Sequence, residues 1–285
     1  MDNRPVLFYD SGIGGLCYGL AFHSRNPAEA LVCLGDRQNF PYGKKSKAEL
    51  INITASLTKK IITMYNPKIM AVACNAASVS ALAELRAAFP ALPIVGTVPA
   101  IKPAVSSSVK RRIGVLGTQR TASDPYIAEL VKKFGPDCAV VNIAAPELVE
   151  FIEHRWTDAA DSEKFNTAKK YIDKFRDSGA DAVVLSCTHF LFLKEEFCRA
   201  AGNEITIYDS LDGICSRLEF LLDSRSLRCG SGSLNNDNGS ASCGASCGAS
   251  CGSGQQPVMA ITGGNAAEPY WEKLAGLFGL KLELI

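Results

Sequence analysis

The stretch KIMAVACNAAS, residues 68–78, decides how the chain folds, because an apolar run ends there at a cysteine and small polar residues follow at once. A short apolar run bounded in this way is typical of a buried strand. The stretch ADAVVLSCTHF, residues 180–190, repeats the arrangement around Cys187. The chain therefore carries the same sequence of strand, thiol and polar turn twice.

Short apolar runs alternate with amphipathic segments along the rest of the chain. The runs that predict buried strands are RPVLFYD (4–10), ALVCLGD (30–36), KIMAVACN (68–75), LPIVGTV (92–98), RIGVLGT (112–118), CAVVNIAA (138–145), ADAVVLSC (180–187), ITIYDS (205–210) and PVMAITG (257–263). Helical spacing of apolar residues marks 47–65, 77–89, 122–134 and 267–278. This alternation predicts an α/β fold with doubly wound, largely parallel, flavodoxin-like sheets.

A faint internal repeat is also present. VLFYDSGIGG precedes IMAVACNAAS in the first part of the chain, as IGVLGTQRTAS precedes AVVLSCTHF in the second. Two similar halves that face each other would follow from such a repeat. The generic appearance of βα units would produce the same likeness, so both interpretations stay open at this point.

Composition excludes several function classes. With 285 residues, 47% of them hydrophobic, the chain can bury a core of one large or two moderate domains. Its net charge of +1 and its scattered basic residues offer no stripe for nucleic acid or for an anionic membrane surface. No apolar window reaches the roughly 18 residues that span a bilayer, and the cysteine spacing favours a reducing compartment. We therefore expect a soluble cytoplasmic protein.

A low-complexity tract runs from residue 225 to residue 256 and is rich in Ser, Gly, Asn, Ala and Cys. Such a composition cannot build a packed core, so we expect a flexible insertion. Cys243, Cys247 and Cys251 recur there every four residues. Metal capture or oxidation by these thiols is the alternative interpretation, but no histidine lies nearby.

The residues that follow the predicted strands carry the chemistry, because ligands of doubly wound sheets bind at the carboxyl ends of the strands. These residues are Asp10, Ser11, Asp36, Pro41, Tyr42, Gly43, Cys74, Asn75, Thr118, Thr121, Cys187, Thr188 and His189. A thiol at a helix start is expected to have a lowered pKa. Two thiols from facing halves could remove a proton from one face of a carbon and return it to the other. That pattern indicates racemisation.

Other interpretations remain open. Cys74 and Cys187 could be buried core residues, could form a disulfide, or could bind zinc with His189. A cysteine hydrolase with His189 as its base would leave one thiol unexplained. The turn DSGIGGL, residues 10–16, matches neither dinucleotide nor P-loop patterns. We expect it to expose the Asp10 carboxylate and the Ser11 hydroxyl, unless these groups only cap a helix.

Six motifs together resemble one known family. They are YDSGIGGL, FPYGKKS, ACNAAS, VGTVPAIKPA, GVLGTQRTASDPY and LSCTHF, in order from residue 5 to about residue 222, with a weaker likeness over 257–285. The chain resembles the cofactor-independent glutamate racemases of the aspartate/glutamate racemase superfamily. This resemblance implies two pseudosymmetric domains, residues 1–99 with 211–285 and residues 100–210, and an active site in the cleft between them.

The resemblance also implies an activity and its residues. The family interconverts L- and D-glutamate without pyridoxal phosphate, metal or nucleotide, supplies D-glutamate for peptidoglycan, and suggests a homodimer. At the matching positions Cys74 and Cys187 would be the acid/base thiols, with help from Asp10 and His189. Glu153 would orient the histidine, with Glu150 as a competitor. The expected substrate-binding residues are Ser11, Pro41, Tyr42, Gly43, Asn75, Ala76, Thr118, Thr121 and Thr188.

Two departures from the family pattern concern the substrate. Ala76 stands where the family has threonine, so one hydroxyl is missing beside the first thiol. Phe190 and Leu191 stand where the family has Tyr-Pro. These changes leave two alternatives open: a racemase or isomerase for another substrate such as aspartate, and a non-catalytic protein that binds an amino acid.

Overall fold

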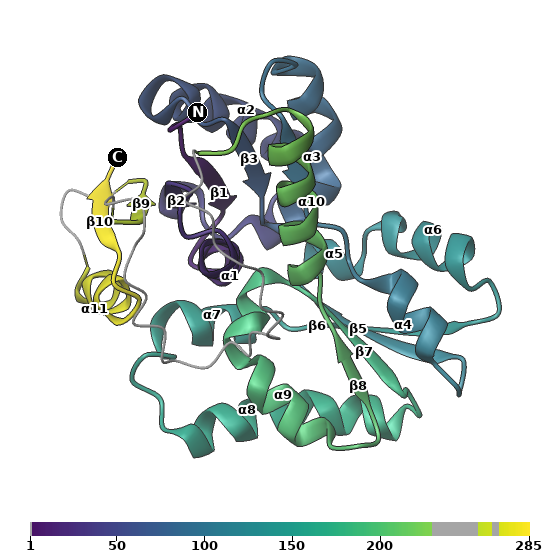
Figure 1. The fold of residues 1–285 in the computed structure, drawn as a ribbon. Helices are drawn as coiled ribbons and strands as arrows, with labels where there is room; N and C mark the ends of the chain where they lie inside the picture. The colour runs from purple at the N-terminus through teal and green to yellow at the C-terminus, as the bar shows by residue number, and fades with distance from the viewer. Residues whose placement is uncertain (1, 230–255, 264–267) are drawn as a thin grey trace.

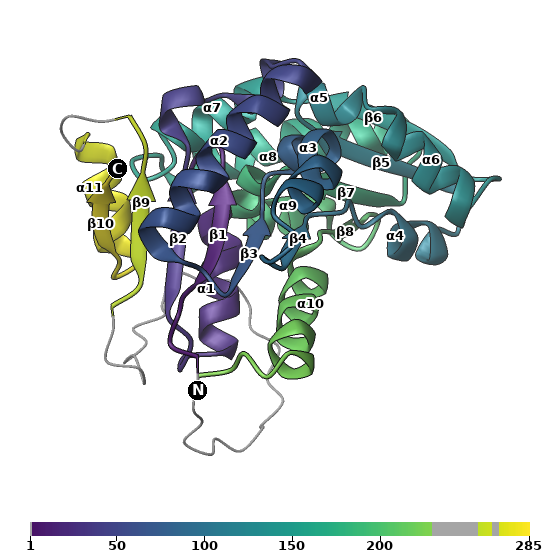
Figure 2. The ribbon, with the colours of Figure 1, turned by 90° about the horizontal axis from the view of Figure 1, so that it is seen from above.

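The structure of the protein, a computed structural model, describes residues 2–229, 256–263 and 268–285. Within these residues the chain forms two parallel β-sheets that carry helices on both faces (Figures 1 and 2). The predicted α/β fold with doubly wound parallel sheets is confirmed. No helix in this described part is long and apolar enough to cross a membrane.

The first sheet has six strands in the order β10-β9-β2-β1-β3-β4. Their bounds are β1 Val6–Asp10, β2 Leu31–Gly35, β3 Ile69–Val72, β4 Ile94–Gly96, β9 Val258–Ile261 and β10 Lys281–Leu284. All neighbours pair in parallel. β1, β2 and β3 are buried along their whole length, which explains why their sequences are uninterrupted apolar runs.

The second sheet has four parallel strands in the order β6-β5-β7-β8. Their bounds are β5 Arg112–Gly117, β6 Ala139–Ala144, β7 Ala182–Ser186 and β8 Thr206–Tyr208. This order repeats β2-β1-β3-β4 of the first sheet, strand for strand. The faint sequence repeat is therefore a repeat of topology. Cys74 after β3 and Cys187 after β7 occupy equivalent positions in the two halves.

Helices flank both sheets. Those around the first sheet are α1 Gly15–Arg25, α2 Lys47–Tyr65, α3 Asn75–Ala88, α10 Leu211–Ser224 and α11 Pro269–Leu277. Those around the second are α4 Ile101–Ser107, α5 Gln119–Ala122, α6 Pro125–Phe134, α7 Pro146–His154, α8 Asp161–Asp177 and α9 Lys194–Ala201. Three 3-10 helices complete the described part of the chain: η1 Arg37–Asn39, η2 Tyr42–Lys44 and η3 Thr188–Leu193.

The core is continuous between the two halves. One large cluster of buried side chains includes Phe8 and Phe22 from the first half and Phe175 and Phe190 from the second. α2 and α3 cover the opposite face of the first sheet, whereas α4 and α6 cover the opposite face of the second (Figure 1). Burying a shared apolar layer holds the carboxyl ends of the two sheets against each other.

The chain passes between the sheets twice. β4 ends at Gly96 and β5 begins at Arg112, while β8 ends at Tyr208 and α10 returns to the first sheet. The domain bounds near residues 100 and 210 stay a prediction. Most of the predicted insertion, including the repeated cysteines of residues 243–251, lies outside the described residues.

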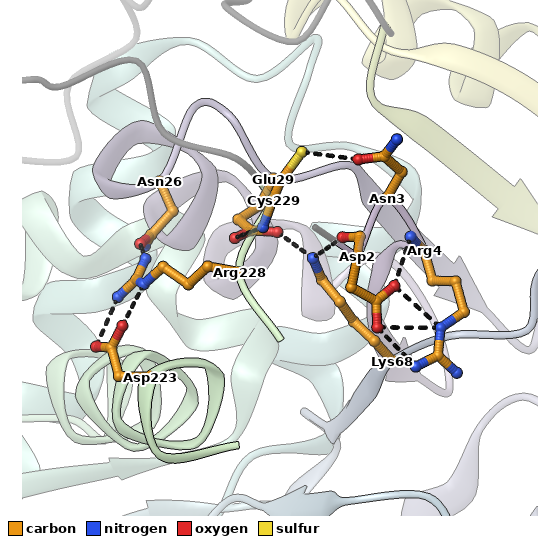
Figure 3. Close-up of polar contacts among 9 residues, drawn as sticks. All are labelled: Asp2, Asn3, Arg4, Asn26, Glu29, Lys68, Asp223, Arg228 and Cys229. Carbon is orange, nitrogen blue, oxygen red and sulfur yellow. Dashed lines mark hydrogen bonds and ion pairs between the residues drawn. The ribbon is translucent and has the colours of Figure 1, made fainter. Parts of the chain in front are cut away.

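The start of that predicted insertion is packed. Residues 225–229 follow α10 to the amino-terminal end of the first sheet (Figure 3). There Glu29 accepts the backbone N–H of Cys229 at 3.1 Å and forms a buried ion pair with Lys68. The Lys68 ammonium also donates to the backbone oxygen of Asp2 at 2.7 Å. Composition placed the start of the flexible tract too early, because it could not show these long-range contacts.

Candidate active site

A pocket lies where the carboxyl ends of the two sheets meet, and both Cys74 and Cys187 line it. Its other lining residues are Ser11, Phe40, Pro41, Tyr42, Gly43, Lys44, Asn75, Ala76, Thr118, Gln119, Pro146, Val149, Glu150, Thr188 and His189. The pocket and its open mouth contain about 540 Å³ not filled by protein atoms.

Cys74 follows β3 and stands at the amino-terminal cap of α3. Its thiol is buried and donates to the Ser11 hydroxyl, with 3.7 Å between Sγ and Oγ. The pKa of Cys74 was expected to be lowered by the helix start, and this expectation is wrong. Burial raises the pKa of the thiol well above its ordinary value, and the nearby Asp10 carboxylate raises it further. Cys74 therefore carries its proton in the free pocket.

Cys187 follows β7 and has a histidine beside it. The Cys187 sulfur lies 3.8 Å from His189 Nδ1, and His189 Nε2 donates to Glu153 Oε1 at 2.5 Å. The same Glu153 oxygen accepts the backbone N–H of Ile13 at 2.8 Å. Burial alone would lower the pKa of His189, but its hydrogen bonds to Cys187 and Glu153 raise that pKa well above its ordinary value. The imidazole is thus placed to exchange a proton with the Cys187 sulfur.

Asp10 lies behind the pocket wall and is fully buried. Its carboxylate accepts Thr188 Oγ1 at 2.8 Å, the Gly12 backbone N–H at 3.1 Å and Ser11 Oγ at 3.2 Å. The expectation that the turn exposes this carboxylate is wrong, since Thr188 from the second half covers it. Asp10 and Ser11 do not cap α1 either, because Gly14 holds that position. Burial raises the pKa of Asp10, and the nearby His189 partly offsets the effect.

The glycines of the turn allow the two halves to touch. A Cβ on Gly12 would lie 1.9 Å from Glu153 Oε1, and a Cβ on Gly14 would lie 2.2 Å from Thr188 Oγ1. Such distances are shorter than any real contact, so a side chain at either position would displace its neighbour. These glycines serve the close approach of Glu153 and Thr188, rather than the binding of a phosphate.

Polar groups that could hold a substrate come from both halves. Asn75 is buried, and neither atom of its side-chain amide has a hydrogen-bond partner among the described residues. Thr118 lines the pocket, and its hydroxyl accepts the backbone N–H of Thr121 at 3.2 Å. Thr121 is buried and does not line the pocket, although its hydroxyl lies 3.2 Å from that of Thr118. Ala76 lines the pocket without a polar side-chain atom.

The loop around Pro41 forms another wall. Pro41, Tyr42 and Gly43 all line the pocket. The Tyr42 hydroxyl donates to Asp36 Oδ2 at 2.5 Å, and Asp36 also accepts Thr262 Oγ1 at 2.6 Å. Asp36, predicted at the same sheet edge, therefore anchors this loop from behind and does not line the pocket.

Six lining residues were absent from the predicted site: Phe40, Lys44, Gln119, Pro146, Val149 and Glu150. Their neighbours in FPYGKKS and GTQRTAS could have indicated Phe40, Lys44 and Gln119. The others lie in α7, and they could not be predicted from the residues that follow the strands. Glu150 had been weighed only as a competitor of Glu153, and it is Glu153 that bonds to His189.

The alternative roles of the two thiols can be compared with the geometry. Cys74 and Cys187 are free thiols and do not form a disulfide. Across the described residues, no group of three or more His, Cys, Asp and Glu side chains is arranged to hold a metal ion. A core role alone does not account for two thiols that line one pocket.

Comparisons with known proteins agree with this architecture. Residues 21–215 match the family model Asp/Glu/Hydantoin racemase. Glutamate racemase of Treponema pallidum strain Nichols is 40% identical over 216 residues, which are 76% of this chain and 80% of the relative. Glutamate racemase of Sphingopyxis alaskensis is 38% identical over 223 residues, or 78% of this chain and 83% of the relative.

A solved structure of Escherichia coli glutamate racemase, with L-glutamate and the activator UDP-MurNAc-ala, has a TM-score of 0.79 to this chain. Its sequence is 27% identical, and the alignment covers 99% of this chain and 98% of the other. The chain belongs to the Asp/Glu/Hydantoin racemase family. The resemblance read from the six motifs is confirmed.

Proposed function

We propose that this protein interconverts L- and D-glutamate by acid/base chemistry at two thiols. The observation that carries the proposal is that Cys74 and Cys187, from equivalent strand ends of the two halves, line one pocket. The named glutamate racemases among its relatives support glutamate as the substrate. The E. coli structure adds support, because that relative was solved with L-glutamate.

The two thiols have different surroundings. Cys74 carries a proton, whereas the Cys187 sulfur can pass its proton to His189, which Glu153 holds in place. In one direction Cys187 removes the α-proton from one face of the substrate, and Cys74 donates a proton to the opposite face. In the other direction the two thiols exchange roles. The product has the inverted configuration at that carbon.

Removing an α-proton next to a carboxylate requires stabilisation of the developing charge. The free side-chain amide of Asn75 and the hydroxyl of Thr118 are fixed dipoles at the pocket wall. Donors that are held in place before the reaction stabilise such charge better than water does. Holding the substrate between two sulfurs also lowers the activation barrier, because the reacting groups are already oriented for proton transfer.

Ala76 favours a second candidate, a racemase or isomerase of the same superfamily that acts on another substrate such as aspartate. Its methyl group lines the pocket and offers no polar atom to a substrate. A third, non-catalytic candidate is an amino-acid-binding protein. Supply of D-glutamate for peptidoglycan, a homodimer and a cytoplasmic location complete the main proposal. The free thiols of the described residues suit a reducing compartment.

Exchange of the α-proton in heavy water separates these candidates. L-glutamate, D-glutamate and L-aspartate are each incubated with the protein in deuterium oxide and followed by proton NMR and chiral chromatography. A glutamate racemase incorporates deuterium into both glutamate enantiomers and equalises them. Exchange confined to aspartate would favour the second candidate. A thermal shift with glutamate but without exchange would identify a binding protein and overturn the proposal.

Replacing either thiol should abolish racemisation. Cys74→Ser and Cys187→Ser each remove one acid/base group, and losing such a group costs about 10²- to 10⁴-fold in rate. Chiral chromatography measures the rate, and circular dichroism checks that each variant is folded. Cys198→Ser is the matched control, because Cys198 is exposed and does not line the pocket. A single pocket variant with full turnover would contradict the two-thiol mechanism.

A further inference from the structure

We propose that Tyr270, in the C-terminal helix α11, is a positioning residue for the acid/base group at Cys187. Tyr270 lies outside the pocket and was not among the predicted site residues. It belongs to the segment that follows the low-complexity tract and completes the first sheet. The activity part of the test rests on the proposed racemase function, whereas the structural part does not.

Tyr270 binds the end of the helix that carries Glu153. Its hydroxyl donates to the backbone oxygen of Ile152 at 2.5 Å. Ile152 lies in the last turn of α7, where carbonyl groups lack partners within the helix. A helix as short as α7 is not stable alone, so contacts with the rest of the molecule set its place. Tyr270 therefore fixes the backbone directly before Glu153.

A second contact joins the same two regions. Lys273, one turn along α11 from Tyr270, forms an ion pair with Asp158 just beyond α7. α11 itself packs against β10, which continues the first sheet from β2 through β9. Figure 1 shows α11 beside α7, between the C-terminal strands and the second half. The edge of the first sheet thus reaches the helix that carries Glu153.

From α7 a chain of contacts leads to the sulfur. Glu153 accepts a hydrogen bond from His189 Nε2, and His189 Nδ1 faces the Cys187 sulfur. The charged and titratable groups that face His189 are Glu153 from α7, Cys187 at the start of η3, and Asp10 from β1. Glu153 Oε1 also receives the Ile13 N–H, so it has little freedom to move without loss of a bond. A small shift of α7 therefore changes the hydrogen bond that holds the histidine.

Weakening the hydrogen bond between Glu153 and His189 changes the pKa of the histidine. The Glu153 carboxylate is one of the groups that raise the pKa of His189. Without the Tyr270 hydroxyl, we expect Glu153 to sit less closely against the imidazole, and the pKa of His189 to fall toward its ordinary value. Misplacement of a catalytic group by a fraction of an ångström lowers the turnover number more than it changes substrate binding.

The test is Tyr270→Phe, which removes one oxygen and keeps the ring. We expect kcat for glutamate to fall by about tenfold to a hundredfold with a small change in KM. The loss in kcat/KM must be equal in both directions, because the equilibrium constant of racemisation is one. NMR of ¹⁵N-labelled imidazole groups, recorded without substrate, should show a lower pKa for His189. The chain has three histidines, which makes the assignment practicable.

Tyr65→Phe is the matched control. The Tyr65 hydroxyl donates to Glu283 in β10 at 3.1 Å, so this variant removes a phenol contact to the same C-terminal segment without touching α7. We expect it to leave kcat and the His189 titration unchanged. Lys273→Gln should act in the same direction as Tyr270→Phe, and it replaces that variant if Tyr270→Phe does not fold.

Two results would overturn the proposal: an unchanged His189 titration in Tyr270→Phe, or the same shift in Tyr65→Phe. Equal losses of melting temperature in both variants, without a change in the titration, would assign Tyr270 a purely structural role and also overturn it. If the protein does not racemise glutamate, the titration still decides, because it requires no substrate. Failure of this inference is therefore distinguishable from failure of the proposed function.

Discussion

Gly12 lies where the two halves of the molecule touch, and the bare backbone at this position leaves room for Glu153 and His189. Gly12→Ala should therefore lower racemisation by more than about tenfold, because the new methyl group would occupy the space of Glu153 Oε1. The measurement is kcat/KM with a thermal melt.

Gly213→Ala in α10 is the control, since nothing lies within 4 Å of a Cβ there. We expect that control to keep its activity and to gain up to about 1 kcal/mol of stability. Full activity of Gly12→Ala would show that Glu153 can move without consequence.

Ala76 tests whether a hydroxyl is missing from the pocket. Ala76→Thr should lower the KM for glutamate, because a hydrogen bond to a charged carboxylate contributes about 1.5 to 3 kcal/mol. Ala76→Val has the same shape as the threonine variant and no hydroxyl, so it measures the effect of the added bulk. Steady-state kinetics of both variants give the difference. An equal KM for Thr and Val would mean that no substrate group reaches this position.

At the same scale, the sequence predicts which residues lie together at the site, but it does not predict their burial or their pKa values. Cys74 and Cys187 could be placed beside each other because polar residues after parallel strands converge at one edge. The raised pKa of Cys74 could not be foreseen, since it depends on how completely the folded chain buries the thiol and on the nearby Asp10 carboxylate. The hydrogen bond by which Thr188 covers Asp10 could not be predicted either, because it joins residues far apart in the chain.

At the level of elements, strands whose sequence forms an apolar run could be predicted, even where they are partly exposed as β6 and β8 are, and a strand interrupted by charged residues could not. β1 to β9 all fall within predicted apolar runs, whereas β10 was missed, because charged residues alternate with leucines in KLEL and the segment forms no apolar run. α8 was also missed, although Ala168, Tyr171, Ile172 and Phe175 are buried at helical spacing. The many charged residues of α8 obscure that stripe in the sequence.

The buried pair of Lys68 and Glu29 anchors the elements at the amino-terminal end of the first sheet (Figure 3). Lys68→Met should destabilise the protein by about 3 to 5 kcal/mol, because the Glu29 charge would remain buried without its partner. The double variant Lys68→Met/Glu29→Gln should recover part of this loss. Urea unfolding measures both. If the double variant is no more stable than Lys68→Met, the two side chains do not act as a pair.

At the level of the whole molecule, stability should depend on pH through His189. The folded protein raises the pKa of His189, so the stabilisation is complete below the unfolded value of about 6.5 and is lost as pH rises through the folded value. The raised pKa of Cys74 has the same sign and acts above about pH 8.5. Urea unfolding between about pH 6.5 and 8 should therefore show a decline in the wild type that largely disappears in His189→Gln. Parallel curves would exclude His189 as the cause.

The order of strands in the first sheet has a consequence for synthesis. β2 is made early, yet one of its two neighbours, β9, belongs to the last part of the chain. Until residues 256–285 leave the ribosome, the apolar strand Leu31–Gly35 presents an open row of backbone donors and acceptors to other nascent chains. A chain that stops before β9 is therefore expected to associate through this edge and precipitate, instead of persisting as a weaker enzyme.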